Sequence, residues 1–188
     1  LNQWKPKRVI EVGSGFSSLL TADVNHNMLN NSIDFTCIEP YPREFLKKKI
    51  PGLNNVIVDK VENVEKSVFT DLESGDILFI DSSHVAKTGS DVNFLFFEIL
   101  PILKKGVRIH FHDIFLPFEY DKSWVLEENR SWNEQYLLRA LLMYSDTFKV
   151  LFGCSYAQNK HPELVSNALN LENNLGFGGV SFWIEKVK

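Results

Sequence analysis

The sequence of 188 residues contains few cysteines and has no long apolar run. Cys37 and Cys154 are its two cysteines, and Cys37 lies in an apolar, strand-like segment. This usage argues against a framework of disulfides and favours a reducing compartment, so we expect a cytoplasmic protein. No apolar run reaches the roughly 20 residues that a membrane-spanning helix needs, and no signal peptide is recognisable. We therefore expect no membrane partner.

Charge of one sign is also scarce. The net charge is −4, and the basic run Lys47–Lys49 is short and local, as expected for the solvated face of a helix. Such a composition does not favour nucleic acid as a partner, and it leaves an acidic or a small-molecule partner open.

The length and the 44% hydrophobic content predict a single domain over residues 1–188. The chain begins with Leu1, only a few residues before its first expected strand. Two interpretations of this start stay open, namely processing of a longer chain and loss of upstream N-terminal helices from a fragment.

Short apolar runs rich in β-branched residues alternate with longer amphipathic segments, which is typical of β-α units around a parallel sheet. The run Ile77–Ile80 is continuously apolar, as expected for a central strand covered on both faces. The expected strands span residues 8–12, 33–39, 55–59, 76–81 and 107–112. The expected helices span residues 17–29, 42–49, 64–72 and 91–104.

A long segment without periodicity follows the fifth expected strand. Residues 114–130 carry Phe118, Tyr120 and Trp124 among other aromatic residues. Loops of this length are commonly lids or binding segments. The aromatic side chains either line a ligand pocket or replace core contacts beneath the loop.

A capping box predicts one further helix. Ser131 and Glu134 have the spacing in which the serine caps the helix and the glutamate reaches back to the capping residue. We expect this helix to continue to about Tyr144.

The last two expected strands have alternating patterns. Apolar residues alternate with polar or turn residues over 148–152 and again over 180–184, which is typical of half-buried, adjacent, antiparallel strands. Gly176–Gly179 reads as the turn before the last strand. The sequence therefore predicts an α/β, Rossmann-like, doubly wound sheet of about seven strands, mostly parallel with an antiparallel C-terminal strand.

A glycine loop follows the first expected strand. The strand Val9–Val12 runs through Glu11 into Gly13 and Gly15. Glycine lets the backbone pass close to a ligand, and the following helix offers free N–H groups, so the loop is typical of a nucleotide-cofactor site. A dinucleotide fingerprint needs a third glycine, and Ser18 occupies that position.

The loop resembles the Glu/Asp-x-Gly-x-Gly motif of class I S-adenosylmethionine-dependent methyltransferases. Glu39, at the end of the second strand, matches the acidic residue that binds both ribose hydroxyls in that superfamily, and a carboxylate suits such a diol. The antiparallel ending also matches, so the resemblance covers nearly the whole chain. It implies S-adenosyl-L-methionine as the cofactor, held by Glu11, Gly13, Ser14, Gly15, Ser17, Glu39 and Asp81.

Two of these carboxylates also have a plainer interpretation. Glu11 could be a buried group that is bonded to loop amides and contacts no ligand. Glu39 could cap the backbone that continues through Pro40.

A second group of polar residues ends the fourth and fifth expected strands. Asp81 and His84 follow the fourth, and His112 and Asp113 follow the fifth. Since ligands bind at the carboxyl ends of strands in open α/β sheets, we expect these residues to converge near the glycine loop. His110 lies deeper on the same side of its strand, so we expect it to serve packing.

These segments resemble a small-molecule methyltransferase subfamily with Asp-x-x-His after the fourth strand, Asp91 in the next helix and a His-Asp pair after the fifth strand. Related O-methyltransferases hold magnesium there, which implies Asp81, Asp113 and His112 as metal ligands. Ile114 departs from the oxygen-rich pattern of those enzymes, and the histidine favours a softer divalent ion over magnesium.

We expect a methyltransferase acting on a small-molecule acceptor, by O-methylation, with Asp81, His84 and His112 as catalytic residues. Either imidazole could be the base, because its pKa suits proton removal near neutral pH. The alternatives are an NAD(P)-dependent Rossmann oxidoreductase, a non-catalytic cofactor-binding relative and a metal-dependent, hydroxylase-like relative. N-methylation and a homodimer also stay open, the latter through Phe94, Phe96 and Phe97.

Overall fold

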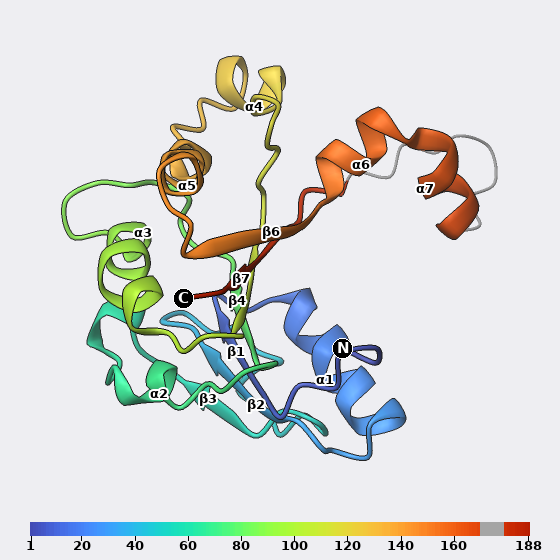
Figure 1. The fold of residues 1–188 in the computed structure, drawn as a ribbon. Coiled ribbons are helices and arrows are strands. Elements are labelled where there is room, and N and C mark those ends of the chain that lie inside the picture. The colour runs from blue at the N-terminus through green and yellow to red at the C-terminus, as the bar shows by residue number, and fades with distance from the viewer. Residues whose placement is uncertain (170–178) are drawn as a thin grey trace.

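The computed structural model describes residues 1–169 and 179–188, and these form one seven-stranded sheet (Figure 1). The strand order is β3-β2-β1-β4-β5-β7-β6. Strands β1 to β5 pair in parallel, whereas β7 is antiparallel to both β5 and β6. The predicted Rossmann-like sheet with an antiparallel ending is confirmed. The strands are β1 (Arg8–Val12), β2 (Asp34–Ile38), β3 (Asn55–Ile57), β4 (Ile77–Ile80), β5 (Arg108–Phe111), β6 (Phe148–Gly153) and β7 (Phe182–Lys186).

Helices cover both faces of the sheet. The α-helices are α1 (Phe16–Met28), α2 (Ser67–Thr70), α3 (Asp91–Phe94), α4 (Lys122–Leu126), α5 (Glu134–Met143), α6 (Cys154–Lys160) and α7 (Pro162–Leu169). Two short 3-10 turns are η1 (Val61–Asn63) and η3 (Leu100–Ile102), and α3 continues through a π-helical stretch, η2 (Leu95–Ile99). The helix expected over 91–104 is thus present as three successive helical stretches, α3, η2 and η3, which end at Ile102.

Each face of the sheet has its own core. Ala22 and Leu29, from α1 and its end, pack with Val9, Phe35 and Ile77 on one face. On the other face, residues from α2, α3, η2 and α5 pack against the alternate side chains of β1, β4 and β5. Burial of apolar surface on both faces is the main stabilising contribution to such a sheet and fixes the strand ends that carry the polar residues.

The residues 42–49 do not form the expected helix. Leu46 N donates to Arg43 O at 2.9 Å, which is a turn bond, and Leu46 is the fully buried side chain of the segment. One buried side chain does not make an apolar helix face, so tertiary packing cannot stabilise a helix there. Pro51 also disfavours helical geometry just after the segment.

Other predicted boundaries change as well. The helix expected over 64–72 is reduced to α2, preceded by η1, and the loop 114–130 contains the short helix α4. Helix α5 begins at Glu134 with Asn133 as its N-cap, so the predicted Ser131 capping box is wrong. Of the expected glycine turn at 176–179, residues 176–178 lie outside the described residues.

Helices α6 and α7 lead away from the sheet beyond β6 (Figure 1). Of the aromatic residues considered for a dimer contact, Phe96 is buried and Phe94 packs against the core, while Phe97 is exposed. Among the described residues, no helix combines the length and the apolar character that crossing a membrane requires.

Candidate active site

The loop between β1 and α1 is fixed to the ends of the two neighbouring strands. Gly13 N donates to Ile38 O at 3.0 Å, and Asp81 N donates to Val12 O at 2.9 Å. Gly13 has φ +78°, and a Cβ there would lie 2.0 Å from the carbonyl oxygen of Asp81. Only glycine therefore fits this position. Gly15 is extended, and no atom lies within 4 Å of the place where its Cβ would be.

Glu39 brings a carboxylate to this loop from the end of β2. Its Oε2 accepts from Ser14 N at 3.0 Å, and its Oε1 accepts from Tyr41 N at 2.8 Å. Each oxygen keeps further accepting capacity. No helix follows Glu39 in the described segment between β2 and β3, so it is not the helix N-cap of the alternative interpretation. Its bond to Tyr41 is local, and its bond to Ser14 is a contact with the glycine loop.

Glu11 and Ser17 lie behind the loop. The Glu11 side chain is buried, and it accepts from Ser17 Oγ at 2.5 Å and from Cys37 Sγ at 3.4 Å. Burial raises the pKa of Glu11. These two residues support the loop from the protein interior, because their polar groups are directed at each other.

A cleft of about 560 Å³ opens where the strand order reverses, between β1 and β4. This is the position at which ligands bind in open α/β sheets. Of the residues expected to hold the cofactor, Gly13, Glu39 and Asp81 line this cleft. The remaining lining comes from β1, from the segments after β2 and β3 and from the segment between β4 and α3, and comprises Val12, Ile38, Pro40, Tyr41, Lys60, Val61, Glu62, Ser82, Ser83, Lys87, Gly89, Ser90 and Asp91.

His84 lies among three carboxylates beside the cleft. Its Nδ1 is 2.9 Å from Glu134 Oε2, and its Nε2 is 3.4 Å from Asp81 Oδ1 and 3.7 Å from Asp113 Oδ2. The expected convergence of Asp81, His84 and Asp113 is present. His84 and Asp113 both have positive φ, +59° and +54°, a backbone conformation that costs a non-glycine residue about 1–3 kcal/mol.

Two opposing effects decide the charge of His84. Burial alone would lower its pKa, but hydrogen bonds to Asp81 and Glu134, with the charges of Glu134 and Asp113, outweigh burial and raise the pKa to about 9. A ring with that pKa already carries its second proton at neutral pH and cannot take another. His84 therefore does not suit the role of base that the sequence suggested.

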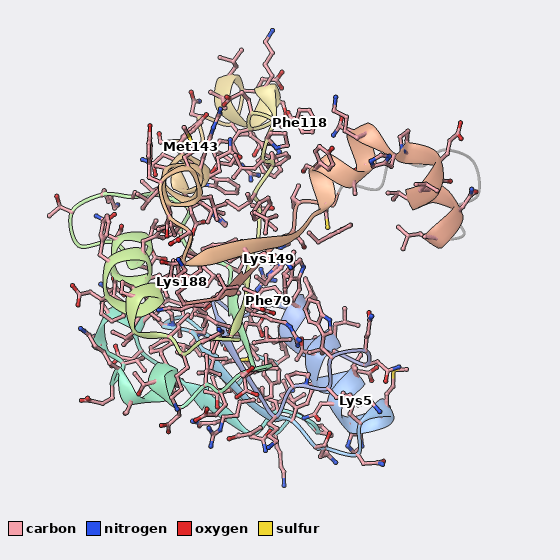
Figure 2. The ribbon with its side chains drawn as sticks, in the orientation of Figure 1. Lys5, Phe79, Phe118, Met143, Lys149 and Lys188 are labelled. Carbon is pink, nitrogen blue, oxygen red and sulfur yellow. The ribbon has the colours of Figure 1, made fainter. Side chains whose placement is uncertain are left out.

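The two histidines of β5 and its end differ in access. His112 is partly exposed, and its Nε2 lies 3.5 Å from Asp113 Oδ1. His110 is buried and stacks against Phe79, with ring centroids 4.0 Å apart, and against Trp183. Phe79 projects from β4, the central strand of the sheet (Figure 2). Burial lowers the pKa of His110 to about 3, which agrees with the expected packing role.

The predicted metal ligands do not form a metal site. Over residues 1–169 and 179–188, no group of three or more His, Cys, Asp or Glu side chains has the arrangement that a metal ion needs. Asp81 and Asp113 both face the His84 ring. His112 lies near the other carboxylate oxygen of Asp113, Oδ1. Among the described residues, Asp81, Asp113 and His112 are therefore not gathered into one such group.

Glu134 is the site residue that the sequence reasoning missed. Its Oε2 accepts from Ser82 Oγ at 2.9 Å as well as from His84. The capping-box pattern assigned Glu134 to the backbone of Ser131. A buried position for a glutamate beside a histidine on another segment is a long-range contact that spacing along the chain does not contain.

Aromatic side chains surround this cluster. Trp132 packs on the His84 ring with centroids 4.2 Å apart, and it contacts Trp124 and Tyr120 edge to face. The Arg130 guanidinium lies over both tryptophans. These contacts support packing as the role of Trp124 and Tyr120 in the segment 114–130. Asp91 does not join the carboxylates around His84. It accepts a hydrogen bond from the Ser83 N–H at 2.7 Å.

Alanine at the two glycines should have opposite outcomes. Gly13→Ala places a methyl group against the Asp81 carbonyl and should lower the free energy of unfolding by roughly 2–5 kcal/mol. Gly15→Ala enters open space and should change it by less than about 1 kcal/mol. Chemical denaturation of both variants measures this, and equal losses would contradict the close approach at Gly13.

The pKa of His84 predicts a pH dependence of stability. Since its folded-state pKa of about 9 exceeds its unfolded value near 6.5, the stabilisation is complete below pH 6.5 and is lost as the pH rises through 9. Wild type should lose about 3 kcal/mol more than His84→Gln over this interval. Urea unfolding at a series of pH values measures the difference, and parallel pH profiles would count against a protonated His84.

Comparison with known proteins agrees with the fold. A family model described as a methyltransferase domain matches residues 10–114, more than half of the chain, from β1 to just past β5. An uncharacterized protein of Archaeoglobus fulgidus is 41% identical over 76 residues, which are 39% of this chain and 34% of that relative. The match thus spans about a third of the relative's length. On the family match and the sheet order together, the chain belongs to the methyltransferase domain family.

Proposed function

We propose that the protein transfers a methyl group from S-adenosylmethionine to a hydroxyl of a small-molecule acceptor in the cytoplasm. The observation that carries this proposal is the Glu39 carboxylate, which stands beside the glycine loop on the cleft at the strand-order reversal. Membership of the methyltransferase domain family supports the reaction class.

The residues around the cleft fit this cofactor. Both Glu39 oxygens are held by backbone N–H groups and can still accept from a pair of vicinal hydroxyls, as on a ribose. Ser14 Oγ is buried and has no hydrogen-bond partner among the described residues, so a polar group remains to be satisfied in the loop. The cleft volume of about 560 Å³ lies in the range of small-ligand sites.

Each loop residue would contribute differently. Gly13 keeps the backbone close to Asp81, Gly15 leaves open space, and Ser14 is held against Glu39. Glu11 and Ser17 support the loop without contacting the ligand. The Asp81 carboxylate, which lines the cleft, would attract the positive sulfonium.

The bound cofactor supplies an electrophilic methyl group. The acceptor oxygen would take this methyl group, and the electron pair of the broken carbon–sulfur bond would stay on sulfur. His112 would take the hydroxyl proton, because its ring is accessible and Asp113 orients it and stabilises the positive charge that it gains. His84 is unsuited to this step because the neighbouring carboxylates raise its pKa to about 9.

Replacing the charge at Glu39 should weaken cofactor binding. Glu39→Gln keeps the size of the side chain but removes the anionic acceptor, so the affinity for S-adenosylhomocysteine should fall about 10- to 100-fold. Isothermal titration calorimetry measures it, with Glu44→Gln, an exposed glutamate of the following turn, as the matched control. If folded wild-type protein bound neither S-adenosylmethionine nor S-adenosylhomocysteine, the proposed function would fail.

Removing the proposed base should affect the rate and spare the cofactor. His112→Gln should lower kcat about 100- to 10,000-fold while the affinity for S-adenosylhomocysteine stays the same. The assay is formation of S-adenosylhomocysteine with an acceptor found in a panel of small phenols and alcohols. His26→Gln, on the exposed side of α1, is the control, and an unchanged rate in His112→Gln would assign the base elsewhere.

A further inference from the structure

The space between Asp81 and Asp113 is filled by the His84 ring. Nε2 faces an oxygen of each carboxylate, at 3.4 and 3.7 Å, and the side chain is buried. A divalent ion held by both carboxylates would need their oxygens at about 2.0–2.6 Å from one centre. The ring stands where that ion would be placed, and its positive charge would repel the ion.

Glu134 holds the ring from the opposite side. Its Oε2 lies 2.9 Å from Nδ1 and also accepts from Ser82 Oγ, so the ring has carboxylate partners at both nitrogens. Nδ1 is within hydrogen-bond distance of Glu134, and Nε2 lies at ion-pair distance from Asp81 and Asp113. Both nitrogens of an imidazolium are donors, so these surroundings favour the charged form of the ring.

The backbone makes this arrangement rigid. The carbonyl oxygen of His84 accepts from the N–H groups of Asn133 and Glu134, at 2.9 and 3.2 Å. The Asn133 side chain binds the backbone of Ala86 through both its oxygen and its nitrogen. Trp132 then covers the ring. The segment after β4 is thereby fastened to the start of α5.

We propose that the His84 imidazolium, positioned by Glu134, is a built-in cation that stands between Asp81 and Asp113 in place of a divalent metal ion. This proposal rests on the proposed function. If the protein is a methyltransferase, the His84 ring would allow methyl transfer without a divalent metal ion. His84 and Glu134 are positioning residues in it. They hold Asp81, which lines the cleft, and Asp113, which contacts the base His112.

Removing the ring should create a metal site. His84→Ala would leave Asp81, Asp113 and Glu134 around an open space, and carboxylates of this kind suit Mn²⁺ and Mg²⁺. Mn²⁺ at about 100 times its Kd should raise the Tm of His84→Ala by about 5–10 °C, and Asp113→Asn in the same background should abolish the shift. Wild type and His26→Ala should show no shift with Mn²⁺ or with EDTA.

The outcomes separate this proposal from the proposed function. A Mn²⁺-dependent Tm in wild type that Asp81→Asn removes would overturn the built-in cation, and so would a folded His84→Ala that ignores Mn²⁺. If His84→Ala does not fold, His84→Gln replaces it under the same criteria. Calorimetry with S-adenosylhomocysteine on wild type, in EDTA and in Mn²⁺, is the independent arm. Loss of cofactor binding in both media overturns the methyltransferase, whereas binding that requires Mn²⁺ overturns the built-in cation.

Discussion

The close approach of Gly13 to the carbonyl of Asp81 is the constraint on which the site depends. It joins the loop after β1 to the end of β4, two strands that are neighbours only because the chain returns to the other side of β1 after β3. Asp81 therefore belongs to two structures at once. Its backbone supports the glycine loop, and its side chain lines the cleft and faces His84. The cofactor side and the reaction side cannot move apart without disturbing this contact.

Burial of charge sets the second constraint. Glu134 is almost inaccessible, and an isolated buried carboxylate is costly, so its pairing with His84 is needed for the fold as well as for the site. Removing one partner of such a pair leaves the other as an uncompensated buried charge, which destabilises the fold. This explains why α5 begins where it does. The helix starts at the residue whose side chain and N–H both bond to the His84 segment, rather than at the serine that a local cap would use.

The features that the sequence predicted are those whose causes lie close together along the chain. Strands β1, β4 and β5 follow from short runs rich in apolar and β-branched residues, and the loop after β1 follows from two glycines after a strand. Glu39 could be placed because it ends a strand whose neighbour carries the loop. The expected helix over 42–49 failed because its pattern lacked a partner surface, and Glu134 was missed because the local capping pattern competed with a contact to a histidine fifty residues away. His112 and His84 looked equivalent in sequence, and only the structure shows that His84 is buried among carboxylates whereas His112 is partly exposed.

The residues of the site divide between two parts of the chain. Glu39, Asp81, His84 and Asp113 lie in the segment that matches the methyltransferase domain family, whereas Trp132 and Glu134 lie beyond it. The matched segment contains the cofactor loop, the cleft and both strand-end carboxylates. The residues that hold the His84 ring between those carboxylates, Trp132 and Glu134, come from the segment before α5 and from its first residue. In a chain with the same first five strands but another residue in place of Glu134, His84 would have carboxylates beside Nε2 only. The charged form of its ring would then be less favoured, and the ring could rotate away. The contact between the β4 end and α5 thus decides whether a ring held by carboxylates on both sides, or two free carboxylates, occupies this sheet edge.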